Sequence, residues 1–334
     1  MSEEILNIQG LSINFPGLIR TVQAVRGVDL TLNKGDLVGL VGESGSGKSM
    51  TASACLGLVP SPGEVTGSVK VSGSEVIGRT EKELARLRGG EAAMIFQNPM
   101  KALNPFFTIG RQMSDAIRCH RPLSSTEAMQ AAIDGLRAVH MPDPEFAVEK
   151  YPHQMSGGQI QRVMIALALA CEPQLLIADE PTTALDVTIQ AQILALLREL
   201  AEERGLTILF ITHDLGVVAT LCDRVAVMYA GRIVETADVH TLFNDPRHPY
   251  TQRLLETVPR LGAHRAELPA IPGQVPDMGT PPMGCAFHPR CHLASDICRT
   301  QDPDNRSPRK GCTVACHHAL GDGQLVDLTT QEAG

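Results

Sequence analysis

The residues from Gly42 to Ser49 have the types and spacing of a loop that binds phosphate. They read GESGSGKS, which fits the pattern G-x-x-x-x-G-K-[ST], and they follow an apolar run at residues 37–41. The glycines let successive N–H groups face phosphate oxygens, and a helix expected at residues 48–58 adds positive charge at its N-terminus. The pattern predicts that Lys48 neutralises the β- and γ-phosphates of a nucleotide and that the Ser49 hydroxyl binds Mg²⁺. The residues expected to contact the nucleotide are Gly42, Glu43, Ser44, Gly45, Ser46, Gly47, Lys48, Ser49 and Met50.

Two carboxylates, Asp179 and Glu180, end another short apolar run at residues 175–178. In that position Asp179 would hold Mg²⁺, directly or through water, and Glu180 would polarise a water in line with the γ-phosphate. Taken alone, a buried strand that ends in Asp-Glu is more often a helix-capping turn. The phosphate loop upstream favours the catalytic interpretation, so the two segments together predict a P-loop ATPase.

A third segment narrows the class of ATPase. Ser156 and the N–H groups of Gly157 and Gly158 precede a helical run at residues 160–170, so they would form a second anion site at a helix N-terminus. A Ser N-cap explains Ser156 but not the Gly-Gly-Gln that follows. The segment Met155-Ser156-Gly157-Gly158-Gln159 resembles the signature motif of the ABC ATPase family. One chain already has its phosphate loop, so the second anion site is expected to close on the ATP of another subunit.

The resemblance implies roles for further positions. Gln97 matches the loop glutamine that contacts Mg²⁺ and water, Asp186 the loop that crosses the dimer interface, and His213 the switch histidine at the γ-phosphate. Ser49, Gln97 and Asp179 are then the expected Mg²⁺ ligands. Phe15 is a candidate for stacking on adenine, although a Phe in an early strand fits a core position equally well. Because the Glu180 and His213 positions are intact, a subunit that holds ATP without hydrolysing it is disfavoured.

Apolar periodicity predicts an α/β fold around a parallel sheet. Runs at residues 37–41, 93–96, 175–178 and 206–212 are typical of strands buried on both faces. Apolar residues between 189 and 200 share one helix face that ends near Gly205, and residues 224–236 form a hairpin around Ala230-Gly231. The family resemblance implies a P-loop NTPase with a RecA-like core, an antiparallel β subdomain, and a helical subdomain at about residues 104–170.

The composition changes after about residue 260, where prolines accompany five of the nine cysteines. We therefore expect an ABC ATPase domain at residues 1–259 and a Cys-rich, loop-rich extension at 260–334 that lacks a core of its own. Residues 243–251 (FNDPRHPYT) and 284–291 (GCAFHPRC) resemble the peptide and nickel importer branch of the family, and most of all its bacterial dipeptide importers.

This resemblance implies a multisubunit importer at the cytoplasmic face of the inner membrane. The expected partners are two transmembrane permease subunits, a second and different ATP-binding subunit paired head to tail, and an extracytoplasmic peptide-binding protein. Importers of oligopeptides, nickel, heme or cationic peptides are not separated from dipeptide importers, because other subunits select the substrate. Apolar Phe106, Phe107 and Ile109 are candidates for the permease dock and equally for the core.

Four cysteines, Cys285, Cys291, Cys298 and Cys316, predict a [4Fe–4S] cluster in the extension. Their intervals are long and uneven, unlike the C-x-x-C pairs typical of structural zinc. Zinc stays an alternative, with Cys312 and nearby histidines as further ligands, and free structural thiols are a third interpretation. The resemblance places the fourth ligand at Cys316 and leaves Cys312 out.

Composition excludes several other functions. The formal net charge is -8 and aromatic residues make up 3% of the chain, so nucleic acid is an unfavourable ligand. A soluble ABC ATPase of DNA repair, chromosome maintenance or ribosome recycling is also disfavoured, because such proteins generally add a second ATPase domain, a long coiled coil or basic surfaces, and the sequence indicates none of these. The N-terminal residues are acidic and the longest apolar stretch, residues 163–171, is too short to span a bilayer, so we expect a peripheral protein without a signal peptide.

Overall fold

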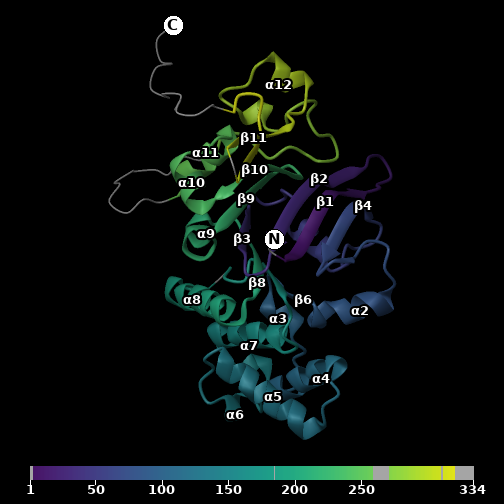
Figure 1. Cartoon of the computed structure of the whole chain (residues 1–334), viewed down its shortest axis with the longest axis vertical. Helices are drawn as coiled ribbons and strands as arrows, with labels where there is room; N and C mark the ends of the chain where they lie inside the picture. The colour runs from purple at the N-terminus through teal and green to yellow at the C-terminus, as the bar shows by residue number, and fades with distance from the viewer. Residues whose placement is uncertain (1–2, 184, 259–270, 310, 320–334) are drawn as a thin grey trace.

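A computed structural model describes residues 3–183, 185–258, 271–309 and 311–319 (Figure 1). Its centre is a sheet of eight strands in the order β11-β12-β10-β9-β3-β8-β7-β6. The strands from β9 to β6 run parallel, and β10 returns antiparallel to β9. The parallel strands are β3 (Leu37–Val41), β6 (Ala92–Ile95), β7 (Leu175–Asp179), β8 (Thr207–Thr212) and β9 (Arg224–Tyr229), and the returning strand is β10 (Arg232–Asp238).

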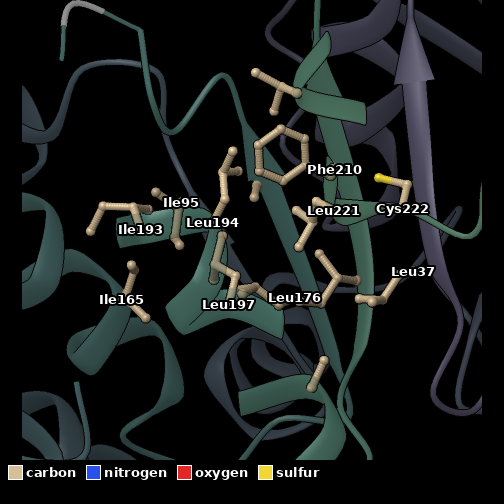
Figure 2. Close-up of a cluster of buried hydrophobic side chains, with 14 of the residues drawn as sticks. Leu37, Ile95, Ile165, Leu176, Ile193, Leu194, Leu197, Phe210, Leu221 and Cys222 are labelled. Carbon is tan, nitrogen blue, oxygen red and sulfur yellow. The ribbon is translucent and has the colours of Figure 1, made fainter. Parts of the chain in front are cut away.

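The central strands are buried at every position in β3, β7 and β8 because both faces of the sheet are covered. On one face, α7 (Gly157–Leu169) and α8 (Val187–Arg204) supply apolar side chains to the cluster drawn in Figure 2. There Leu176 and Phe210 of the strands lie with Ile193 and Leu197 of α8. Continuous apolar runs are what a strand covered on both faces requires, so the sequence located these strands to within one residue.

The other face of the sheet packs against a four-stranded antiparallel sheet in the order β2-β1-β4-β5. Alternate residues such as Ile8, Leu32 and Val69 point into this second core, where they meet Leu40 of β3. The antiparallel subdomain implied by the family resemblance is therefore present. Its strands are β1 (Glu4–Phe15), β2 (Val22–Asn33), β4 (Glu64–Val71) and β5 (Ser74–Glu75).

The segment between β6 and β7 is mostly helical, as its polar, Pro-punctuated sequence indicates. Each long helix begins at a side-chain cap: the Thr108 hydroxyl accepts from Arg111 N, and Ser124 forms a capping box with Glu127. The side chain of Ile109 is fully buried, so this residue belongs to the core, whereas Phe106 is 83% exposed. The helices here are α3 (Pro99–Ala102), α4 (Ile109–His120), α5 (Ser125–Ala138), α6 (Pro144–Ala147) and α7; two others, α1 (Lys48–Cys55) and α2 (Glu81–Gly90), precede β6.

The described part of the C-terminal extension joins the central sheet. Strand β12 (Cys312–Ala315) pairs with β10, where Glu235 is opposite Val314, and β11 (Asn305–Arg309) adds the edge strand. Phe287 is buried against the rings of Tyr229 and Tyr250, so this segment shares the core of the cassette. The expectation of a loop-rich tail missed both strands. The division at residues 259 and 260 falls in a segment outside the described residues and stays a prediction.

Short helices complete the C-terminal half: α9 (Leu215–Leu221), α10 (Val239–Asn244), α11 (Pro249–Glu256), the 3-10 turn η2 (His288–Arg290) and α12 (Asp296–Thr300). Figure 1 shows α12 and its neighbouring loops at the end of the molecule opposite α4, α5 and α6. No helix among the described residues is long and apolar enough to cross a membrane.

Candidate nucleotide-binding site

The phosphate loop runs from the end of β3 into α1, as its sequence indicates. Gly47 caps the helix at φ 103°, and a Cβ there would lie 2.5 Å from the Ala24 carbonyl oxygen, so only glycine fits. Lys48 is buried inside the loop, where its Nζ donates to Gly42 O at 2.8 Å and to Glu43 O at 3.0 Å. Burial lowers the pKa of Lys48, and the carboxylates of Glu180 and Asp179 oppose that shift. A buried cation enclosed by backbone groups is suited to an anion.

Asp179, the last residue of β7, meets Ser49 of α1. The Ser49 hydroxyl donates to Asp179 Oδ1 at 3.2 Å, which joins two of the three predicted Mg²⁺ ligands. Burial raises the pKa of Asp179, and the bond from Ser49 partly offsets that rise. The Asp179 carboxylate and the Ser49 hydroxyl are both hard oxygen donors, which are the ligands that Mg²⁺ prefers. Mg²⁺ would also compensate the negative charge that burial destabilises.

Glu180 gathers the other predicted catalytic residues. Its Oε2 accepts from Gln97 Nε2 at 2.8 Å and from Thr183 Oγ1 at 3.0 Å, and its Oε1 lies 3.1 Å from His213 Nδ1. Burial alone would raise the pKa of Glu180, but the bonds from His213, Thr183 and Gln97 together hold it below its ordinary value. Glu180 is thus held as a carboxylate. Backbone strain accompanies this placement, because Glu180 has φ 47°.

Thr183 is a residue that sequence reasoning missed. It follows Glu180 by three positions in the turn Glu180-Pro181-Thr182-Thr183, and its backbone N–H also donates to Glu180 O at 3.2 Å. The sequence could have indicated this contact, because Thr183 follows the Glu180 carboxylate by three residues within a Pro-containing turn.

One cleft of about 720 Å³ runs from the start of the phosphate loop to His213. Lys48, Ser49 and Asp179 are not among the residues that line it. Its remaining wall comes from Leu254 and Thr257 of the α11 region and from Ile271 and Val275, which lie beyond the predicted domain boundary. The contribution of the extension to this wall was not expected from the sequence. The other residues on the cleft are Gly42, Glu43, Ser44, Gln97, Glu180 and Thr183.

Phe15 and Met50 are not among the residues that line this cleft. Both are half-buried and pack against the core beneath the antiparallel sheet. The ring of Phe15 lies so close to the backbone of Gly63 that a Cβ there would be 2.9 Å from Phe15 Cε1. Adenine stacking on Phe15 and nucleotide contact by Met50 stay predictions.

The signature residues lie at the start of α7. Ser156 Oγ accepts from Gln159 N at 3.4 Å and Gln159 Oε1 accepts from Ser156 N at 3.1 Å, a capping box. Ser156 and Gly157 are exposed and are not among the lining residues of the cleft. Asp186 is also exposed at the N-cap of α8, where it accepts from Ile189 N at 2.9 Å. Ser156 and Asp186 are therefore accessible to another subunit, as their predicted roles require.

The four predicted cluster ligands converge without forming a metal site. The pKa of the Cys316 thiol is raised to about 12, first by burial and also by Cys285, Cys291 and Cys298. Cys312 lies instead near Glu235 and Arg309. Within the described residues, which include all five of these cysteines, no group of three or more His, Cys, Asp or Glu side chains could hold a metal ion. The structure therefore does not support the prediction of a [4Fe–4S] cluster or of zinc, because the side chains as placed do not form a metal-binding arrangement.

The fold and the site together define a P-loop ATPase cassette, and comparisons with known proteins agree. Residues 25–183 match the family described as ABC transporter, and residues 234–298 match the family described as Oligopeptide/dipeptide transporter, C-terminal region. The chain is similar to the dipeptide transport ATP-binding protein DppD of Escherichia coli (strain K12), with 46% identity over 95% of this chain and 98% of that one. It is similar also to the oligopeptide transport ATP-binding protein OppD of Salmonella typhimurium, with 47% identity over 90% of this chain and 89% of that one.

A solved structure gives the same result for the cassette. The ATP-binding cassette MJ0796 in a dimeric post-hydrolysis state, bound to ADP and phosphate, superposes with a TM-score of 0.62 and 28% identity over 70% of this chain and 98% of that chain. The protein belongs to the ABC transporter family of ATP-binding subunits, and its C-terminal region belongs to the oligopeptide/dipeptide transporter type.

Proposed function

We propose that this chain is the ATP-hydrolysing subunit of a bacterial importer of dipeptides or short oligopeptides. The observation that carries the proposal is the convergence of Gln97 and His213 on the Glu180 carboxylate, in one cleft with the phosphate loop. The similarity to dipeptide and oligopeptide transport ATP-binding proteins over most of their length supports the substrate class.

In the proposed mechanism the loop residues 42–50 bind the triphosphate of ATP, with Lys48 beside the β- and γ-phosphates. Ser49, Asp179 and Gln97 would hold Mg²⁺, which neutralises charge on the phosphates when bound. Glu180 accepts a hydrogen bond from the attacking water and orients it, while His213 holds Glu180 and faces the γ-phosphate. The bonds from His213, Thr183 and Gln97 favour the ionised form of Glu180 and hold its pKa below the ordinary value, so this side chain is a hydrogen-bond acceptor for water.

The complete site requires a second subunit. Ser156, Gly157, Gly158 and Gln159 would bind the γ-phosphate side of a partner's ATP, and Asp186 would lie at the interface. The exposure of Ser156 and Asp186 supports this arrangement. We propose a head-to-tail heterodimer with a second ATP-binding subunit, joined to two transmembrane permease subunits at the cytoplasmic face of the inner membrane and supplied by an extracytoplasmic peptide-binding protein. Exposed Phe106 is a candidate contact to a permease subunit.

Substrate-stimulated ATPase activity of the purified complex tests the proposal. Membranes that contain all subunits are reconstituted with the binding protein, which is loaded in turn with a dipeptide, an oligopeptide, Ni²⁺ or heme. We expect peptide-loaded binding protein to raise ATP turnover above that of the unloaded protein. If only Ni²⁺ or heme stimulates turnover, the proposed peptide substrate is wrong but the assignment as a transporter ATPase holds. If the chain hydrolyses ATP at the full stimulated rate without the membrane subunits, a transporter role is refuted.

A [4Fe–4S] cluster bound by Cys285, Cys291, Cys298 and Cys316 is a further part of the proposal. It is supported by the four thiols being close enough to influence one another. Cluster binding requires the thiols to move together from the positions described above. Iron and sulfide analysis of anaerobically purified protein decides: about four of each per chain supports the cluster, and one zinc per chain without iron replaces it.

A further inference from the structure

An ion pair connects the C-terminal extension directly to the phosphate loop. The guanidinium of Arg290, at the end of η2, binds both carboxylate oxygens of Glu43, with Nη1 to Oε2 at 2.7 Å and Nη2 to Oε1 at 3.0 Å. The two residues are 247 positions apart in the chain. The Arg290 side chain is 4% exposed and that of Glu43 is 27% exposed, so this pair is shielded from solvent far more than a surface pair.

Other residues hold Arg290 in this position. Its Nε donates to Pro272 O at 2.8 Å, and its Nη1 also lies 3.3 Å from the Tyr229 hydroxyl. On the loop side, the Glu43 backbone N–H donates to the hydroxyl of Tyr250 at 3.0 Å. Both the side chain and the backbone of Glu43 are thus bound by residues from the C-terminal half, and neither end of the ion pair is free to reorient without breaking several bonds.

The position of Glu43 makes its charge a problem for nucleotide binding. It is the second residue of the phosphate loop and lies on the same cleft as Glu180. Its charge is also near enough to Lys48 to oppose the lowering of the Lys48 pKa by burial. A triphosphate carries several negative charges, so an uncompensated carboxylate beside the loop repels it. A bidentate Arg cancels that charge and holds the carboxylate on the side of the extension.

We propose that Arg290 is a positioning residue for ATP binding, which neutralises Glu43 and fixes the first turn of the phosphate loop from the C-terminal extension. The inference rests on the proposed binding of ATP at residues 42–50. It makes the extension a part of the nucleotide site, since loss of the η2 turn would expose a negative charge at the loop.

A double-mutant cycle on the full chain separates this charge effect from a purely structural one. Affinity for mant-ATP, a fluorescent ATP analogue, is measured by titration in the presence of Mg²⁺ for Arg290→Met, Glu43→Gln and the double variant. We expect Arg290→Met to weaken binding about tenfold, as an unpaired carboxylate near a triphosphate would. Glu43→Gln should bind at least as tightly as the wild type, because it leaves Arg290 as an excess positive charge, and the double variant should return to within about threefold of the wild type.

A matched control tests whether any ion pair to the extension has the same effect. Arg20 binds Asp277 at 2.7 Å, and both side chains are about half exposed. Arg20→Met should leave mant-ATP affinity unchanged. In addition, the affinity of Arg290→Met should fall more steeply than that of the wild type as ionic strength is lowered, because salt screens the repulsion from Glu43.

Two results of this double-mutant cycle would overturn the inference. If Glu43→Gln binds more weakly than the wild type, or if the double variant is as weak as Arg290→Met, repulsion of ATP by the Glu43 charge is excluded and the proposal is wrong. Should Arg290→Met fail to fold, Glu43→Gln and Arg290→Lys decide in its place. Arg290→Lys keeps the positive charge but loses the bidentate contact, so we expect it to bind more weakly than the wild type, and the double variant Glu43→Gln with Arg290→Lys should recover the affinity. Lys48→Met keeps this separate from the proposed function: if that variant binds mant-ATP as the wild type does, the loop is not the nucleotide site.

Discussion

Replacement of Glu180 by Gln tests the central residue of the proposed mechanism with little structural disturbance. The carboxylate has three partners, Gln97 and Thr183 on Oε2 and His213 on Oε1. A Gln at this position can direct its amide oxygen to Gln97 and Thr183 and its amide NH₂ to His213 Nδ1, once the imidazole proton moves to Nε2. The geometry is therefore retained and the negative charge is lost.

The expected magnitudes follow from these contacts. Hydrogen bonds to a charged group contribute about 1 kcal/mol more than neutral ones, so three bonds set an upper limit near 3 kcal/mol for the loss of stability. The His213 side chain is 62% exposed, so solvent screening reduces this to roughly 1 kcal/mol. Loss of a general base that orients water costs about 10²- to 10⁴-fold in turnover. The variant should thus fold and bind ATP but hydrolyse it at least a hundredfold more slowly, and an ATP-bridged dimer should accumulate.

The assay is phosphate release from the assembled complex, combined with mant-ATP affinity and size-exclusion chromatography with ATP. Glu199→Gln is a matched control, because Glu199 also pairs with a histidine, His140 Nε2 at 3.3 Å, on an exposed surface. That control should hydrolyse ATP at the wild-type rate. Turnover of Glu180→Gln within a few-fold of the wild type, with ATP binding intact, would refute a catalytic role for Glu180.

Three other outcomes follow from the structure. Ser156→Arg should leave mant-ATP binding to its own chain unchanged but should lower ATP turnover at the partner subunit's phosphate loop; full activity of the mixed complex would exclude composite sites. Cys285→Ser and Cys298→Ser should each remove the iron from anaerobically purified protein, whereas Cys312→Ser should not. Equal iron content in all three variants would exclude this ligand set. Burial lowers the pKa of His248 to about 3, so the folded state resists protonation and stability should fall as the pH drops from about 6.5 towards 3, by at most about 1.4 kcal/mol per pH unit. His248→Asn keeps an acceptor for the Tyr250 N–H and should flatten this slope in thermal unfolding scans; an unchanged slope would assign it to other groups.

The sequence predicted the parallel strands and the phosphate loop because each depends on local chemistry. A strand buried on both faces must be apolar throughout, as β3 and β8 are, and a loop that wraps phosphate must combine glycines with Lys48 and Ser49. Gln97, Glu180 and His213 were located from their motifs, and the structure brings them together. Their catalytic roles stay predictions.

The strands of the antiparallel sheet were harder to locate because their alternation is interrupted. The register between β1 and β2 shifts at several points, and β1 and β4 shift again between Gln9 and Ser12. The bulge between Ile8 and Leu11 lets both side chains be buried although they are three positions apart, so no simple period of two survives. Strand β11 has exposed polar residues and a Pro, as an edge strand permits, and β12 finds its partner β10 far away in the sequence.

The residues of the C-terminal half that contact the phosphate loop could not be predicted from the sequence, because they are far from the loop along the chain. The ATPase family match covers residues 25–183 and the C-terminal match begins at residue 234, yet Glu43 binds Tyr250 and Arg290 from the second region. His248 belongs to the same region and hydrogen-bonds to the backbone of Ala315 in β12, so the start of α11 is attached to β12, while Tyr250 of the same helix binds the phosphate loop. Since Arg290 directly precedes Cys291, any rearrangement that gathers the thiols around a cluster must act on the residue that holds Glu43. If both proposals hold, the extension and the affinity for ATP are linked through Arg290. We then expect mant-ATP affinity to differ between metal-free and metal-loaded protein only while Arg290 and Glu43 are both present, and an equal difference in Glu43→Gln would exclude this link.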